Sequence, residues 1–278
     1  LSSSTDFDKL IYQYMIKAGT VTGRELCMIL YEQGVLPMDE TQYNNLASGA
    51  TGAYDFLRSK IQSLEITPGQ LGLEPCRGSV VITDTDSGDV LACVSYPGYD
   101  NNRLANTMDS EYYNELNTST SQPFYNSATQ ETTAPGSTYK PLVAVAGLTE
   151  GAIDTSTTVY CDGNFDVISP EVHCWVYPAG HGTMNVVSGI TNSCNEFFNN
   201  IGYQLGMQTD GTYSSEYGLE RLAKYAELFG LSETSGLEIP EMDPKVSDED
   251  SVRSAMGQGT NNYTTSQLAR YITAVANK

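Results

Sequence analysis

The stretch TAPGSTYKPL runs from Thr133 to Leu142 and holds the most informative residue pattern in the chain. Pro141 fits only the first turn of a helix, because deeper in a helix it lacks the N–H and clashes with the residue i−4. We therefore expect a helix that begins near Ser137 and ends at Gly151. Its apolar residues are expected to be mostly buried: Leu142, Val143, Val145, Ala146 and Leu148.

Ser137 and Lys140 share one face of this helix, because residues i and i+3 are neighbours on a helix surface. Free N–H groups at the helix start favour a negative charge beside Ser137 and disfavour an ammonium on Lys140. Burial would also lower the pKa of Lys140, which could then accept a proton from Ser137. Serine and lysine at this spacing form one element of a catalytic serine motif. The alternative is an ordinary helix with a capping serine.

A second polar element, Ser193-Cys194-Asn195, lies between two predicted helical stretches. The Ser193 hydroxyl can relay a proton between a lysine and a leaving amine. The Asn195 amide can bind both that lysine and a peptide carbonyl of the substrate. The alternative is a pair of capping residues for the helix that follows. Tyr139 and Cys194, inside the two motifs, are predicted to be packing residues, because both residue types are usually buried.

The rest of the chain predicts a helical part followed by a mixed part. A capping box at Thr22 and Glu25, a cap at Asp39 and an amphipathic pattern over 52–65 indicate helices. Prolines and glycines in ITPGQLGLEPCRG (66–78) mark a boundary. We therefore predict a helical lead-in over residues 1–75 and a second domain over 76–278. In the second domain, 79–97 reads as a strand pair and 264–278 as a final helix.

Composition excludes several classes of function. The net charge of −20 argues against nucleic-acid binding, because a polyanion requires a basic surface. It also argues against docking on anionic lipid. No apolar run approaches the roughly 20 residues that a membrane-spanning helix needs. The N-terminal LSSSTDF lacks the features of a signal peptide and an initiator Met, so we expect the chain to be a piece of a longer protein.

The six cysteines are scattered and form no CxxC pattern. Cys161 and Cys174 are spaced plausibly for a bridge across a hairpin, and the sequence leaves that question open. His173, Cys174 and His181 raise the possibility of zinc. Their spacing fits no standard zinc pattern, and neighbouring residues on a strand point to opposite faces. The sequence therefore predicts no metal and no cofactor.

Four stretches, in order, resemble the transpeptidase domain of class B, monofunctional penicillin-binding proteins. The resemblance covers the chain from about residue 76 to its end. It rests on VVITDTDSGDVLACVSYPGYDNN (80–102), APGSTYKP (134–141), HCWVYPAGHGTMNVVSGITNSCNEFFNNIGYQLG (173–206) and SAMGQGTNNYTTSQLARYITAVAN (254–277). It implies an α/β (α+β) fold of the β-lactamase/transpeptidase type. In that fold an antiparallel sheet is flanked by helices and joined to an all-α lobe, with a helical segment before it here.

The resemblance also implies a reaction and a place in the cell. Ser137 would attack the D-Ala-D-Ala carbonyl of a peptidoglycan stem peptide, with Lys140 as base, Ser193 as proton relay and Asn195 as substrate ligand. Ser193 is also implied in substrate binding. β-Lactam antibiotics would acylate the same serine. The parent protein would lie on the extracytoplasmic side of the bacterial cell envelope, anchored by an N-terminal membrane helix, with other cell-wall synthesis proteins as partners.

One part of the family pattern is missing. A Lys-Thr-Gly or Lys-Ser-Gly motif normally follows the Gly-Gln-Gly stretch and its helix, but here Lys278 ends the chain. A near match at Lys17-Ala18-Gly19-Thr20 reads better as a helix end. We therefore expect an incomplete sheet, and we expect that this chain alone does not crosslink peptidoglycan. Ready turnover of a D-Ala-D-Ala peptide by the 278-residue chain would refute the second expectation.

Two groups of alternatives stay open at this point. Within the same fold, the chain could belong to a D,D-carboxypeptidase, a serine β-lactamase or a β-lactam sensor. A long-lived acyl-enzyme favours the transpeptidase, and fast release favours the lactamase. From a different class, it could be a non-catalytic scaffold that keeps the fold. Intact Ser137, Lys140, Ser193 and Asn195 argue against the scaffold.

Overall fold

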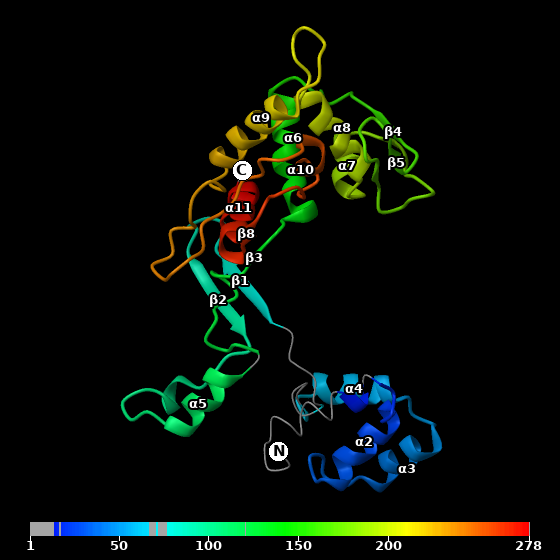
Figure 1. The fold of residues 1–278 in the computed structure, drawn as a ribbon, viewed down its shortest axis with the longest axis vertical. Helices are drawn as coiled ribbons and strands as arrows, with labels where there is room; N and C mark the ends of the chain where they lie inside the picture. The colour runs from blue at the N-terminus through cyan, green and yellow to red at the C-terminus, as the bar shows by residue number, and fades with distance from the viewer. Residues whose placement is uncertain (1–13, 17, 67–70, 72–76, 120, 278) are drawn as a thin grey trace. The chain divides into compact units, whose positions relative to one another are not determined.

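The computed structural model describes residues 14–16, 18–66, 71, 77–119 and 121–277 (Figure 1). By their contacts these residues form two compact units. One unit joins the described residues before position 77 to Asn101–Gln122, and the other joins Arg77–Asp100 to the described residues from Pro123 onward. The sequence placed residues 101–122 inside the second domain, whereas their contacts group them with the first unit.

The first unit is helical, and its capping signals lie where the sequence placed them. α2 (Gly23–Glu32) begins with the predicted capping box, α3 (Glu40–Ser48) follows a capping Asp39, and α4 is Ala53–Gln62. These three helices bury a small apolar cluster of their own, which includes Leu26, Leu30, Leu46 and Phe56. α5 (Ser110–Thr118), capped by Asp109, lies in a polar stretch that the sequence did not identify as helical.

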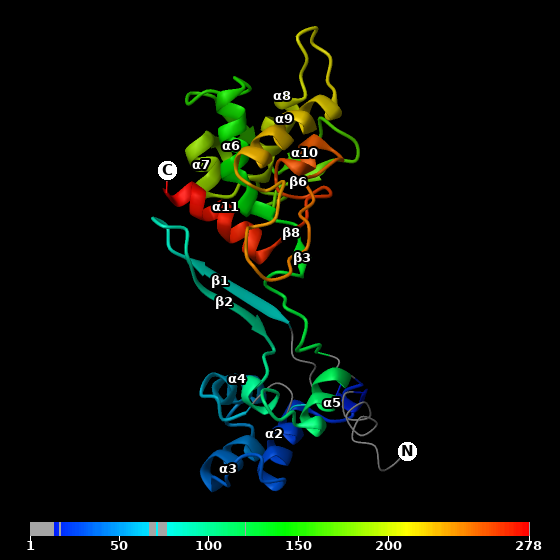
Figure 2. The same cartoon turned by 90° about the vertical axis from the view of Figure 1, so that its left-hand side faces the viewer.

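The second unit contains the predicted strand pair. β1 (Gly78–Thr83) pairs antiparallel with β2 (Val90–Tyr96), with an irregularity after Ile82. Residues alternate along β1, so that Val81 is half-buried while Val80 and Ile82 are exposed. α11 (Thr265–Asn277) runs along the hairpin (Figure 2). The hydroxyls of Ser79 and Thr265 lie 2.8 Å apart.

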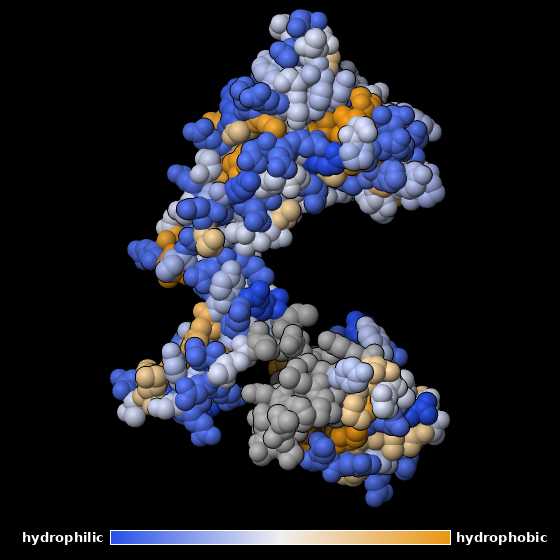
Figure 3. All heavy atoms as spheres, viewed as in Figure 1, coloured by the Kyte–Doolittle hydropathy of each residue, from blue (hydrophilic) through white to orange (hydrophobic). Residues whose placement is uncertain are grey.

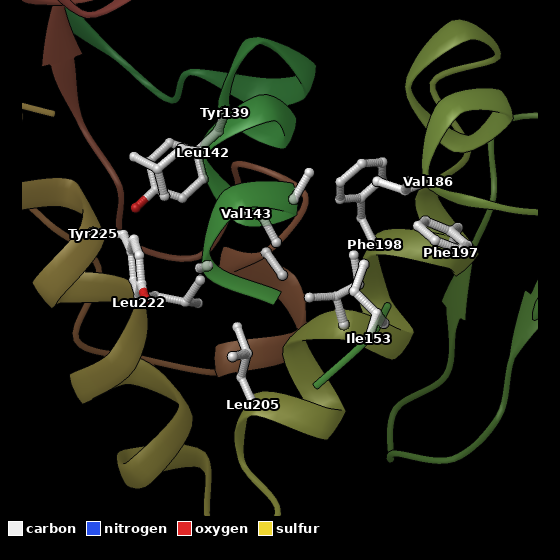
Figure 4. Packing of buried hydrophobic residues seen from close by; sticks show 14 of the residues in the cluster. Tyr139, Leu142, Val143, Ile153, Val186, Phe197, Phe198, Leu205, Leu222 and Tyr225 are labelled. Carbon is white, nitrogen blue, oxygen red and sulfur yellow. The ribbon is translucent and has the colours of Figure 1, made fainter. Parts of the chain in front are cut away.

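The rest of the second unit is a helical lobe around α6 (Lys140–Thr149). α6 packs against α8 (Asn195–Leu205) and α9 (Ser215–Leu228), with α7 (Val186–Thr191) and α10 (Ser251–Ser254) beside α8. Figure 4 shows side chains of α6 between those of α9 and those of α8. Burial of these apolar groups is the main source of the lobe's stability.

The expected burial of the α6 residues is only partly correct. Leu142, Val143 and Ala146 are fully buried, but Val145 and Leu148 are 40% and 38% exposed. The period of the helix explains the difference, because residues 145 and 148 fall on the side of α6 away from α8 and α9.

Three short strand pairs position the loops around the lobe. β3 (Thr132–Thr133) pairs with β8 (Tyr263–Thr264), which brings the segment before Ser137 beside the start of α11. β4 (Val159–Cys161) pairs with β7 (Gly182–Met184), and β5 (Asn164–Phe165) pairs with β6 (Val172–His173). The last two pairs form a small subdomain next to α8.

The predicted fold class is confirmed. Helices and an antiparallel sheet form one unit, the lobe is helical, and the β1–β2 sheet has two strands within the described ranges. None of the helices in the described part of the chain is both long enough and apolar enough to span a membrane. Figure 3 shows hydrophilic residues over most of the visible face, as the charge of −20 leads one to expect.

Candidate active site

Ser137 lies in a short 3₁₀ turn, η3 (Gly136–Tyr139), which leads directly into α6 at Lys140. The predicted helix start near Ser137 is therefore correct in place, but its first turn is 3₁₀ and not α. Pro141 occupies the first turn of α6, where it costs least. Ser137 is exposed, and Lys140 is only 1% exposed.

The Gly-Gln-Gly stretch (257–259) is hydrogen-bonded to this turn. The Gly136 N–H donates to the Gly257 carbonyl over 2.9 Å, and both glycines have positive φ, +55° and +80°. A Cβ on Gly257 would lie 1.9 Å from the Gly136 oxygen, a distance that atoms do not tolerate. Position 257 therefore requires glycine for a close approach of two backbone segments as well as for its φ.

The four predicted site residues form one hydrogen-bonded group. The Ser193 hydroxyl donates to the Ser137 hydroxyl over 2.7 Å. Lys140 Nζ donates to Ser193 Oγ at 3.0 Å, to the Ser193 carbonyl at 2.8 Å and to Asn195 Oδ1 at 2.8 Å. In this hydrogen-bond chain Ser137 is connected to Lys140 through Ser193, where the sequence suggested a direct contact along the helix.

Burial lowers the pKa of Lys140 to about 8, because the ammonium loses its water. Negative charge on the thiols of Cys174 and Cys194 would raise that pKa, but burial has the larger effect. The Phe198 ring centroid lies 5.5 Å from Nζ. A lysine with such a pKa is partly neutral near neutral pH and can act as a proton acceptor.

Ser193 has a strained backbone. Its φ is +50°, a conformation that costs a non-glycine residue on the order of 1–3 kcal/mol. Its N–H donates to the Ile190 carbonyl at 3.0 Å, and the indole N–H of Trp175 donates to the Asn192 carbonyl at 3.1 Å. These bonds hold the turn that directs Ser193 toward Ser137.

The alternative role proposed for Ser193-Cys194-Asn195, capping of the next helix, is filled by Cys194 and not by Ser193. Cys194 is the N-cap of α8, and its sulfur accepts from the Phe197 N–H at 3.5 Å. Ser193 therefore does not cap α8 and keeps its hydroxyl for Ser137. Cys194 and Tyr139 are both buried, as their predicted packing role requires.

Cys194 also belongs to a cluster that the sequence did not predict. The sulfurs of Cys161, Cys174 and Cys194 and a ring nitrogen of His181 all lie within 4.8 Å of one another. His181 Nδ1 lies 3.5 Å from the sulfurs of both Cys161 and Cys174. All three thiols are free, so Cys161 and Cys174 are not bridged in this structure.

The donor set of this cluster fits a metal ion. Three sulfurs and one imidazole nitrogen are a common ligand set of structural zinc sites, which are tetrahedral. Burial raises the pKa of the Cys161 thiol. Burial also opposes ionisation of Cys174, but N–H groups of Glu196, Asn195 and Val176 outweigh this effect and lower its pKa. A thiolate at Cys174 would be a ready ligand.

The sequence missed this cluster for a physical reason. Cys161 belongs to β4, Cys174 follows β6 and Cys194 precedes α8, so no short spacing joins them. His173 and Cys174 point apart, as predicted: Cys174 is buried, whereas His173 is exposed and stacks on Tyr177 with ring centroids 4.1 Å apart. Of the near match at 17–20, Lys17 lies outside the described residues.

Comparison with known proteins identifies the family of this chain. A family model described as the penicillin binding protein transpeptidase domain matches residues 78–278. The chain is 32% identical over 180 residues to the peptidoglycan D,D-transpeptidase MrdA of Haemophilus influenzae, an alignment that covers 61% of the chain and 24% of that protein. The chain thus spans about a quarter of the length of this curated relative.

Solved structures agree with the sequence match. Pseudomonas aeruginosa PBP2 in complex with WCK 5153 has a TM-score of 0.63 and 28% identity, over 72% of this chain and 47% of that chain. A chain of a peptidoglycan synthase complex, studied for its coordination of polymerization and crosslinking, has a TM-score of 0.64 and 28% identity, over 72% of this chain and 35% of that chain. The chain belongs to the penicillin-binding protein transpeptidase domain family.

Proposed function

We propose that this chain carries the acyl-transfer centre of a peptidoglycan D,D-transpeptidase. The observation that carries the proposal is the hydrogen-bonded series Ser137–Ser193–Lys140, with bonds of 2.7 and 3.0 Å. An exposed hydroxyl is joined by one relay to a buried amine whose pKa is about 8. These are the parts that nucleophilic catalysis by a serine requires. The similarity to D,D-transpeptidases of the MrdA type supports the choice of substrate.

In the acylation step Ser137 Oγ forms a bond to the carbonyl carbon of the penultimate D-Ala. Its proton passes to Ser193 Oγ as the Ser193 proton passes to neutral Lys140. The resulting tetrahedral intermediate breaks its C–N bond, and the proton returns along the same route to the departing D-Ala amine. The product is an ester on Ser137. With a β-lactam the same C–N bond opens, but the leaving amine stays tethered.

In the second step an amine from a neighbouring stem peptide attacks the ester carbonyl. The new C–N bond forms, the C–O bond to Ser137 breaks, and the amine's proton returns to Ser137 through Lys140 and Ser193. Each step leaves Ser137, Ser193 and Lys140 with no net gain or loss of a proton. Lys140 accepts a proton as the tetrahedral intermediate forms and returns it as the intermediate breaks down.

Asn195 is the proposed substrate ligand. Its Oδ1 accepts from Lys140, which fixes the orientation of the amide. Within the described part of the chain, its Nδ2 makes one hydrogen bond, a long one of 3.5 Å to the His173 carbonyl. A substrate peptide carbonyl is a better acceptor at hydrogen-bonding distance and can replace that contact.

The same proposal places the protein at the bacterial cell envelope, on the extracytoplasmic side, where stem peptides are crosslinked. A membrane-anchored parent protein fits this location. Similarity to a chain of a peptidoglycan synthase complex supports other cell-wall synthesis proteins as partners. β-Lactams are the expected covalent inhibitors.

We also propose that Cys161, Cys174, His181 and Cys194 bind a zinc ion, since their donor atoms and mutual distances suit it. When bound, zinc would supply a structural cross-link between three chain segments. Cys194 lies directly between Ser193 and Asn195 in the chain, so the site would anchor the turn that carries both.

The test of the proposed function is a turnover assay on the complete gene product with a D-Ala-D-Ala peptide and an acceptor amine. We expect release of D-Ala to be matched by formation of the peptide–amine product. Release of D-Ala with hydrolysis, but without that product, would indicate a carboxypeptidase. No release, together with no covalent β-lactam adduct, would indicate the non-catalytic scaffold.

A further inference from the structure

The hydroxyl of Tyr271, in α11, is bonded to the backbone of the segment Ser137–Leu142. The Leu142 N–H donates to Tyr271 Oη at 3.2 Å, and the hydroxyl donates to the Thr138 carbonyl at 3.0 Å. The side chain is fully buried, and the Phe229 ring packs edge-on against it with centroids 5.6 Å apart. Both hydrogen-bonding functions of the phenol are thereby used on the backbone around Ser137 and Lys140.

The two groups that meet at Tyr271 would be partners in an uninterrupted helix. In an α-helix the N–H of residue i donates to the carbonyl of residue i−4, which for Leu142 is Thr138. Here the hydroxyl of Tyr271 is bonded to both groups at the junction where η3 ends and α6 begins. Side chains inserted in this way open or bend a helix.

This junction determines the relative position of the nucleophile and the base. Ser137 lies on the 3₁₀ side and Lys140 on the α side, and the Lys140 N–H donates to the Ser137 carbonyl in the tighter 3₁₀ pattern. Pro141 supplies no N–H that could stabilise an alternative. The Tyr271 hydroxyl is therefore well placed to keep the two segments at the angle that lets Lys140 reach Ser193 and Asn195.

The phenol remains a neutral donor in this environment. Burial raises the pKa of Tyr271 to about 12, an effect that the Leu142 N–H partly offsets. Without the hydroxyl, the Leu142 N–H and the Thr138 carbonyl would be buried without a partner unless they bonded to each other directly. That direct bond would require the junction between η3 and α6 to close.

We propose that Tyr271 is a positioning residue for acylation: its hydroxyl, inserted between Thr138 and Leu142, sets the geometry of Lys140 relative to Ser137. The proposal rests on the proposed function of this site. It assigns no contact with substrate to Tyr271.

The test compares Tyr271→Phe with Tyr225→Phe in the complete gene product. Tyr225 is a matched control, because it is also buried against α6, but its hydroxyl donates to Glu150 at the far end of that helix, at 2.9 Å. Each variant loses one buried hydroxyl. The readouts are the second-order rate of acylation by a fluorescent penicillin, its pH profile and the melting temperature.

We expect both variants to melt at lower temperature, and only Tyr271→Phe to acylate more slowly, by about tenfold or more. The pH midpoint of acylation should move in Tyr271→Phe and stay in place in Tyr225→Phe. Equal acylation rates and pH profiles in the two variants, with Ser137→Ala unreactive, would overturn the inference and leave the proposed function standing. A wild-type protein that forms no adduct would instead remove the proposed function.

A measurement on the wild type keeps the inference testable if Tyr271→Phe does not fold. Amide hydrogen exchange at Leu142 should be strongly protected, because its partner is a buried hydroxyl. Exchange at Leu142 as fast as at an exposed loop amide would contradict the insertion of Tyr271, whatever the enzyme activity.

Discussion

The Ser193 hydroxyl lies 2.7 Å from the Ser137 hydroxyl, although 56 residues separate the two serines in the chain. Lys140 reaches Ser137 through this second hydroxyl. The proposed proton relay therefore depends on the strained turn at Ser193 as much as on the 3₁₀ turn and helix that carry Ser137 and Lys140.

Replacing Ser193 with alanine should slow acylation by penicillin about 10²-fold, because a positioned proton relay contributes roughly that factor. Thr191→Ala is the control, because Thr191 is exposed at the end of α7 and its hydroxyl donates to the Val187 carbonyl within that helix. Stopped-flow acylation of both variants gives the comparison. A Ser193→Ala rate within twofold of Thr191→Ala would exclude Ser193 as the relay.

Acylation should increase with pH through about 8 and then level off. The group responsible is Lys140, whose pKa is lowered to about 8 by burial, while charge on the Cys174 and Cys194 thiols facing it would raise that pKa. Since the neutral amine accepts the proton, its population grows as pH rises through this value. Lys140→Arg should lose acylation at every pH, because a guanidinium stays charged. An acylation rate that does not change between about pH 6 and pH 9, limits at least about one unit on either side of the Lys140 pKa, would be inconsistent with Lys140 as base.

Gly257→Ala should destabilise the protein by about 3 kcal/mol or more, because the new Cβ would collide with the Gly136 oxygen. Gly211→Ala is the matched control: Gly211 has a similar φ of +85° and open space around it. Gly211→Ala should lower the free energy of unfolding only by the cost of the left-handed backbone conformation, about 1 kcal/mol. Urea unfolding measures both, and equal losses would mean that the close approach of the two backbones has no energetic effect.

Purified protein should contain zinc at the Cys161–Cys174–His181–Cys194 cluster, and removal of zinc by a chelator should lower the melting temperature. Cys161→Ser should reduce metal content, whereas Cys93→Ser, at an exposed cysteine outside the cluster, should not. Elemental analysis gives the stoichiometry. Cobalt substitution adds a second readout through its thiolate absorption bands. Equal metal content in the two variants would rule out the cluster as the site.

Local patterns made most of the fold predictable. The capping box at Thr22, the cap at Asp39 and the two apolar, β-branched runs in 79–97 act over a few residues, and each is found in its predicted element. The two motifs of the proposed active site are also local, so Ser137, Lys140, Ser193 and Asn195 could be named from the sequence. Their hydrogen bonds, by contrast, depend on packing between α6 and the turn before α8.

Features that depend on distant segments could not be predicted. The cysteine cluster needs three segments to meet, and the Tyr271 hydroxyl accepts a hydrogen bond from Leu142, which is 129 residues away in the chain. The need for glycine at position 257 arises only when its backbone touches that of Gly136. No periodicity or spacing in the sequence reports such contacts.

The most direct test of Ser137 as the nucleophile is intact-mass analysis of the complete gene product after incubation with penicillin. We predict one covalent adduct with the mass of the opened β-lactam, located on Ser137 by peptide mapping and absent from Ser137→Ala. An unmodified wild-type protein that is demonstrably folded, or an adduct that persists in Ser137→Ala, would contradict Ser137 as the nucleophile.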